Sequence, residues 1–202
     1  MKYFIIEKDK SYTFSDYFHL DPPIDDLLDY FGYIYDRQDY ALPKTDVGLQ
    51  TFGYLKEHTQ GNLYQVDLSS EIARREALIS PVLFAVARYL KAIVKIEYPM
   101  KVNEQLKGKI DYFIRRENNL LVVEAKQGDL QRGFTQLAVE LIAFDKWLDD
   151  DDKPIYGIVS MGNVWQFGIL NRHTKIITQD MNLFRVPADL DELLQILLAI
   201  LG

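Results

Sequence analysis

Three charged side chains interrupt segments whose other residues are mostly apolar, and together they have the composition of a hydrolytic metal site. In NLLVVEAK, the alternation of a strand places Glu124 and Lys126 on one face. In the preceding segment, GKIDYFIRR, Asp111 stands among isoleucine and phenylalanine side chains. If the two segments pair through the short turn between them, Asp111 and Glu124 lie at similar distances from that turn. We therefore expect the two carboxylates to converge from adjacent strands.

A cation would reconcile these two carboxylates, which repel each other at close range unless one is protonated. The chain has no cysteine and three scattered histidines, so thiolate sites are excluded and a hard ion is expected. We predict Mg²⁺ or Mn²⁺ held by Asp111, Glu124 and the carbonyl of Ala125. Such an ion bridges a scissile phosphate and a water and lowers the pKa of that water. Lys126 then orients or activates the water or neutralises the phosphate; alternatively, it only extends from the strand end to solvent.

A helical pattern beginning at Ser69 precedes these strands and carries two further acids. Glu76 falls on its apolar face and could add a water-mediated metal ligand. Glu71 competes for this role, although an acid in the first turn is also expected because it stabilises the helix dipole. Pro81 predicts either a kink or a new helix start capped by Ser80.

The order of periodic segments predicts an α/β fold. After the helix over 69–90 we expect a three-strand meander, a crossover helix, two more strands, two candidate edge strands and a C-terminal helix, at 93–102, 108–116, 119–126, 129–148, 155–160, 164–170, 174–179, 183–186 and 190–201. Residues 1–66 are predicted to form an N-terminal elaboration packed on a domain at 67–202. In it we expect a strand near 2–7, a helix near 23–35 and then irregular chain.

With these residues in place, the sequence resembles the PD-(D/E)xK nuclease superfamily, which has the restriction endonuclease-like fold. The resemblance spans roughly residues 69–170 and rests on Asp111, the Glu124-Ala125-Lys126 triplet, the acid-bearing helix before them and Gln136 in the helix after them. REALISPVL and GNVWQFG are also similar to segments of type I restriction subunit nuclease domains and of uncharacterised bacterial members. Ile110 stands where the namesake motif has proline.

The resemblance implies Mg²⁺- or Mn²⁺-dependent hydrolysis of a nucleic-acid phosphodiester, with DNA as the expected partner. It also implies that Gln136 contacts the site or the nucleic acid, whereas its ordinary role would be that of a polar residue on a helix flank. The alternative function is a catalytically silent nucleic-acid-binding or assembly protein on the same fold. In a third interpretation, the acidic N-terminal segment is a protein-interaction surface.

The distribution of charge qualifies the net charge of -7, which by itself would disfavour a phosphate backbone as partner. Residues 71–116 carry 10 basic and 5 acidic side chains, whereas 1–70 carry 6 and 12, and 117–202 carry 7 and 13. A basic central block is compatible with a phosphate-facing surface, or with ordinary surface patchiness. The candidate phosphate contacts are Arg74, Arg75, Lys107, Lys109, Arg115 and Arg116.

The composition and the apolar runs bear on disorder, secretion and membrane insertion. With 48% hydrophobic residues, the chain has enough apolar material for a sizeable core, which excludes disorder as its main state. The start MKYFIIEKDK lacks the pattern of a signal peptide, and the longest apolar run, LLQILLAIL, is shorter than a membrane span requires. We therefore expect a cytoplasmic protein with no membrane partner, and leave a homodimer open.

Overall fold

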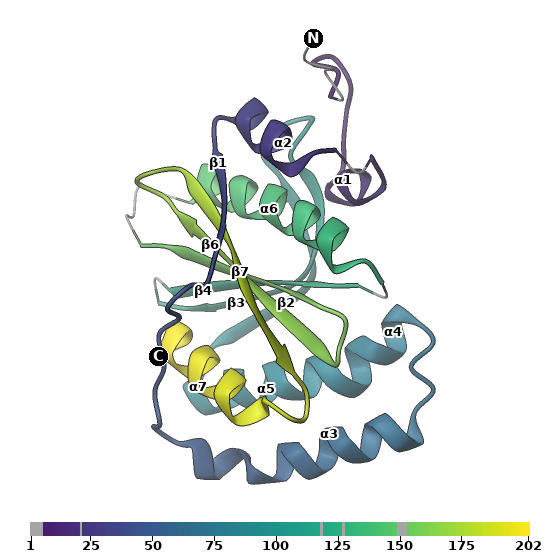
Figure 1. The fold of residues 1–202 in the computed structure, drawn as a ribbon, viewed down its shortest axis with the longest axis vertical. Helices are drawn as coiled ribbons and strands as arrows, with labels where there is room; N and C mark the ends of the chain where they lie inside the picture. Colours follow the sequence, from purple (N-terminus) through teal and green to yellow (C-terminus); the bar gives the residue numbers. More distant parts are fainter. Residues whose placement is uncertain (1–5, 21, 118, 127, 149–152) are drawn as a thin grey trace.

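The computed structural model describes residues 6–20, 22–117, 119–126, 128–148 and 153–202, which form a seven-stranded sheet with helices on both faces (Figure 1). The strands are β1 (Ile34–Gln38), β2 (Ile93–Lys101), β3 (Lys107–Arg116), β4 (Asn119–Ala125), β5 (Ile155–Ser160), β6 (Val164–Asn171) and β7 (Ile176–Arg185). The helices are α1 (Phe14–Leu20), α2 (Ile24–Phe31), α3 (Gly53–Gln65), α4 (Glu71–Arg74), α5 (Ser80–Leu90), α6 (Leu130–Trp147) and α7 (Leu190–Leu201), with a 3₁₀ turn at Leu49–Phe52 and a π-helical turn at Arg75–Ile79.

The strands lie in the order β1-β7-β6-β5-β4-β3-β2. β2, β3 and β4 form the predicted antiparallel meander, while β4 and β5 are parallel. A parallel pair requires a crossover connection, which α6 supplies. β5, β6 and β7 are antiparallel, and β1 pairs in parallel with β7 at the edge. The predicted α/β class is confirmed, including a meander followed by a helical crossover.

Two apolar cores form on the two faces of this sheet. One lies under α1, α2 and α6, and the other under α3, α5 and α7 (Figure 1). The alternation of β4 separates them, because Val122 belongs to the first core and its neighbours Leu121 and Val123 belong to the second. Asp129 caps the N-terminus of α6, since its side chain accepts a hydrogen bond from the backbone N–H of Arg132. The buried side chains of α6 pack against β4 and β5.

The two predicted edge strands at 174–179 and 183–186 are a single strand, β7, which lies inside the sheet. The prediction was wrong because a polar stretch, Asp180 to Asn182, separates the apolar segments. Asp180 is nevertheless buried, and its Oδ1 accepts hydrogen bonds from the backbone N–H groups of Tyr40 and Asn182. These bonds satisfy Oδ1 within a continuous strand, whereas Oδ2 is buried without a hydrogen-bond partner among the described residues.

The N-terminal part contains more regular structure than predicted. Residues 53–65 form α3 instead of irregular chain; only Leu55 and Thr59 of this helix are buried, so it has no apolar stripe to predict it. The helix expected near 23–35 ends at Phe31, because Gly32 adopts a left-handed conformation and the chain turns into β1. Of the strand expected near 2–7, residues 2–5 lie outside the described residues, and residues 6 and 7 are not in a strand.

The helix predicted over 69–90 is present but changes pitch before Pro81. A π-helical turn at Arg75–Ile79 joins α4 to α5, and Ser80 donates its hydroxyl hydrogen bond back to the carbonyl of Glu76. Ser80 therefore does not act as the expected side-chain cap of a new helix.

The predicted boundary at residue 66 falls between α3 and α4. The segment before it packs on the remainder of the chain, adds β1 to the sheet and adds helices to both faces. Within the described parts of the chain, no helix has the length and apolar character needed to cross a membrane.

Candidate active site

The register of β3 and β4 brings Asp111 and Glu124 together. The last pair in their antiparallel ladder is Tyr112 with Val123, so Asp111 and Glu124 would form the next pair. There, Asp111 Oδ2 accepts a hydrogen bond from the backbone N–H of Ala125, at 2.9 Å. Adjacent strands thus place the two carboxylates next to each other, as the sequence predicted.

Glu124 is the centre of this group, and its side chain is only 2% exposed. Its Oε1 lies 2.5 Å from Lys126 Nζ and accepts a 2.7 Å hydrogen bond from Gln136 Nε2 of α6. Its Oε2 is buried and has no hydrogen-bond partner among the described residues. Burial, together with the nearby carboxylates of Glu140 and Asp111, raises the pKa of Glu124 well above its ordinary value.

Lys126 is held in this group by two contacts. Besides the ion pair with Glu124, its ammonium lies 5.1 Å from the ring centroid of Phe18 in α1. Burial opposes the charge of the ammonium, but the Glu124 carboxylate outweighs burial and raises the pKa of Lys126. Lys126 is therefore a charged donor directed into the site rather than a side chain extended to solvent.

Glu140 is a member of the site that the sequence analysis did not identify. It is fully buried on α6, where its Oε1 accepts a 2.9 Å hydrogen bond from Gln136 Nε2, while its Oε2 has no partner within the described parts of the chain. Burial raises the pKa of Glu140 to about 7. Its position four residues after Gln136, inside an otherwise apolar run, is the sequence signal that could have found it.

Arg75 is the second cation of the site. Its Nη1 lies 2.6 Å from Glu97 Oε1 and 3.4 Å from Asp111 Oδ1, and its guanidinium carbon lies 5.1 Å from the centre of the Tyr112 ring. Burial raises the pKa of Asp111, although the Ala125 N–H and the Arg75 charge oppose this shift. Arg75 was predicted as a contact for nucleic acid, and in this structure it pairs with the carboxylates of the site.

The structure brings Glu71, rather than Glu76, to the group. Glu71 and Lys126 line the same cavity of about 520 Å³. Burial raises the pKa of Glu71, and Asp111 adds to this shift, whereas the positive charge of Lys126 opposes it. Glu76 is exposed, and its charge acts on Tyr112.

Most of the other basic side chains predicted to contact phosphate bind neighbouring groups of the protein. Arg74 donates to the carbonyls of Leu68 and Met161, and Arg115 and Arg116 donate to the carbonyl of Glu117 and to those of the C-terminal residues. Lys107 pairs with Glu104 at 2.6 Å, and Lys109, which is well exposed, lies 3.5 Å from Glu97. The acids within the basic block thus neutralise much of its charge.

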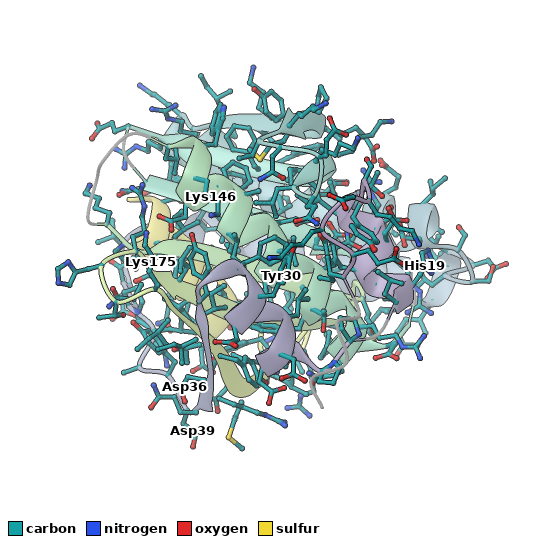
Figure 2. The ribbon with its side chains drawn as sticks, turned by 90° about the horizontal axis from the view of Figure 1, so that it is seen from above. His19, Tyr30, Asp36, Asp39, Lys146 and Lys175 are labelled. Carbon is teal, nitrogen blue, oxygen red and sulfur yellow. The ribbon has the colours of Figure 1, made fainter. Side chains whose placement is uncertain are left out.

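A second buried charged group lies at the other end of α6. Asp145 pairs with Arg172 at 2.8 Å and with Lys175 at 2.7 Å, and accepts a 2.6 Å hydrogen bond from the hydroxyl of Tyr33. Figure 2 shows Lys146 and Lys175 on one side of the molecule and His19, from α1, on the other. This group connects elements of the fold and does not belong to the candidate site.

The site offers few oxygen donors for a hard metal ion. No cluster of three or more His, Cys, Asp or Glu side chains in the described ranges is placed to hold a metal. The two carboxylates of Asp111 and Glu124 nevertheless fit Mg²⁺ or Mn²⁺ in chemical type, and the buried, unpartnered Oε2 of Glu124 is an oxygen that an ion could satisfy.

Comparisons with protein-family models, with curated proteins and with solved structures found no match to this chain. Any functional conclusion therefore rests on the geometry of the site.

Proposed function

We propose that the chain is a metal-dependent nuclease with the restriction endonuclease-like fold, hydrolysing a phosphodiester of nucleic acid, with DNA as the expected substrate. The observation that carries the proposal is the convergence of Asp111, Glu124 and Lys126 from two adjacent strands, beside a cavity. Gln136 and Glu71 reach the same place from α6 and α4. The order of elements around these residues, a helix, a meander, a crossover helix and a parallel strand, supports the same proposal.

In this proposal each residue has a distinct task. Asp111 and Glu124 would hold Mg²⁺ or Mn²⁺, with the Ala125 carbonyl as a further ligand, and the ion would supply Lewis-acid activation of a water and neutralise phosphate charge. Lys126 donates to the water or to the phosphate. Gln136 fixes the Glu124 carboxylate, since its amide donates to Oε1.

Cleavage assays of the purified chain with Mg²⁺ or Mn²⁺ on single-stranded, duplex and branched DNA and on RNA test the proposal. We expect Asp111→Asn, Glu124→Gln and Lys126→Met to lower the rate by at least about 100-fold, because each removes a group that stabilises the transition state. Glu57→Gln is the matched control, since Glu57 is exposed on α3 and does not line the cavity. Absence of cleavage by the wild type, or equal cleavage by the variants, would overturn the proposal.

The contact between Arg75 and Asp111 favours a second candidate, a catalytically silent binding or assembly protein. With Arg75 on Asp111 and Lys126 on Glu124, the chain neutralises these carboxylates with its own cations. Nucleic-acid binding that weakens with salt, without cleavage in either metal, would support this candidate.

A further inference from the structure

We propose that α1 forms a binding site for an unpaired nucleotide beside the carboxylates, so that the substrate is a single strand or an unpaired end rather than a continuous duplex. This inference deepens the proposed nuclease function and rests on it. It begins with the sequence of α1, FSDYFHL, in which positions 15, 18 and 19 share one helix face.

The opposite face of α1 is anchored in the protein. Phe14 and Tyr17 are buried, and the Tyr17 hydroxyl donates a 2.7 Å hydrogen bond to the backbone carbonyl of Gln105. Thr13, directly before the helix, pairs with Lys107 of β3 in a parallel bridge. Since the buried face is fixed in this way, α1 can present its other face to a ligand without first becoming ordered.

That other face lines the cavity at the candidate active site. Ser15, Phe18 and His19 lie on one side of the cavity, while Glu71, Lys126, Gly128, Asp129 and Gln136 complete it. Its volume of about 520 Å³ falls in the range of roughly 300–1,000 Å³ that is typical of pockets for compact organic ligands. His19, which Figure 2 labels, is an exposed member of this lining.

The chemistry of the lining suits a base next to a phosphate. Phe18 is half-buried and offers an aromatic surface, and the Lys126 ammonium beside its ring can neutralise a phosphate. Gln136 is 3% exposed, and its Oε1 is an acceptor that lacks a hydrogen-bond partner among residues the structure describes. An N–H donor on the pairing edge of a base would satisfy that acceptor.

Base pairing decides which nucleic acid can use such a site. In a duplex, a base is covered on both faces by its neighbours and on its pairing edge by its partner, so only groove edges remain. An unpaired base offers its faces to an aromatic side chain and its pairing edge to hydrogen-bonding groups. Phe18 would contact the face of a base and Gln136 its pairing edge, and only an unpaired base exposes both.

Fluorescence anisotropy at fixed salt tests this site with the full chain and with Ca²⁺ in place of Mg²⁺, so that binding is measured separately from cleavage. The probes are short labelled single strands of DNA and RNA and a blunt DNA duplex. We expect the wild type to prefer a single strand, and Phe18→Ala to weaken that binding roughly fivefold to a hundredfold, because base–aromatic contacts are worth about that much. Phe18→Tyr should restore single-strand binding, and duplex binding should be equal in all variants.

Phe84→Ala is the control, since Phe84 is also a partly exposed phenylalanine but lies on α5. Equal single-strand binding by Phe18→Ala and the wild type, or a wild type that prefers duplex, would overturn the inference. Binding that follows Phe18 without any cleavage in Mg²⁺ would refute the nuclease and leave the nucleotide site standing. Cleavage that is equal in Phe18→Ala and the wild type, and equal on single strands and duplex, would refute the nucleotide site and leave the nuclease standing.

Discussion

The buried carboxyl of Glu140 is the least expected single residue of the site. It shares the amide of Gln136 with Glu124, so two carboxyl groups are buried around one donor. Two buried acids are costly when both are charged, and burial accordingly raises the pKa of Glu140 to about 7, against an ordinary value of 4.5. A bound cation would remove this cost, so the effect of the two carboxyl groups on stability is measured in the metal-free protein.

Glu140→Gln should stabilise the metal-free protein at high pH. Because the folded protein binds this proton more tightly than the unfolded chain, the free energy of unfolding falls as pH rises from about 4.5 to about 7 and stays low above it. The substitution removes that loss, which we expect to be on the order of 3 kcal/mol. Urea unfolding in EDTA should show the full gain at pH 8 and little gain at pH 5.

Glu57→Gln is the control for this experiment as well, since an exposed acid should give no difference at either pH. A Glu140→Gln protein that is less stable than the wild type at pH 8 would mean that the glutamate is charged and favourably paired.

At the scale of single residues, the sequence indicated which side chains come together but not which groups each of them contacts. The proximity of Asp111, Glu124 and Lys126 could be predicted because charged side chains in apolar segments require a reason, whereas Gln136 entered only through the resemblance to a nuclease superfamily. The choice between Glu71 and Glu76 could not be made, because the π-helical turn at Arg75–Ile79 changes which side chains follow on the face that α4 presents. The partners of Arg75 depend on β2 and β3 folding beside this turn, which local patterns do not encode.

At the scale of elements, the approach of α6 to β5 positions Lys126. Gly133 lies on α6 where a Cβ atom would come within 2.7 Å of Val159 Cγ2 and 3.0 Å of Lys126 Cγ. Gly61 on α3 has no atom within 4 Å of a built Cβ among the described residues. Replacing each of these glycines by alanine therefore separates two effects, the intrinsic preference of a helix for alanine and the close packing of α6 on the sheet.

Gly61→Ala should raise the free energy of unfolding by about 0.5–1 kcal/mol, because alanine costs less entropy than glycine in a helix. Gly133→Ala should lower it, since α6 must move away from the sheet or Lys126 must shift. Under the proposed function, Gly133→Ala also slows cleavage. Thermal unfolding of both variants checks the first contrast, and a stabilised Gly133→Ala protein would contradict it.

The elements themselves were predictable wherever burial leaves a clear period. β3, β4, α6 and α7 alternate or repeat strongly because each buries one or both faces. α3 and β1 were missed because most of their side chains are exposed, so neither shows a period. β7 was predicted as two strands because the hydrogen bonds of its central polar residues form only in the folded protein.

At the scale of the whole molecule, Asp145 joins segments that are distant in sequence. Its carboxylate contacts Arg172 after β6, Lys175 before β7 and Tyr33 from the N-terminal segment. The side chains of Asp145 and Arg172 are 2% and 8% exposed. Burial opposes the charge of Asp145, but hydrogen bonds from Arg172, Lys175 and Tyr33 outweigh it and lower the pKa of the carboxyl.

Asp145→Asn should destabilise the whole fold by about 3 kcal/mol at pH 7, because a buried guanidinium loses its carboxylate. Since the folded pKa is depressed, this contribution is present above the ordinary value of 3.8 and is lost as pH falls through the folded pKa. The difference between wild type and variant in urea unfolding should therefore shrink below about pH 4. Asp39→Asn, at an exposed position after β1, is the matched control and should behave as wild type. An unchanged stability of Asp145→Asn at pH 7 would show that this charged group does not contribute to holding the N-terminal segment on the sheet.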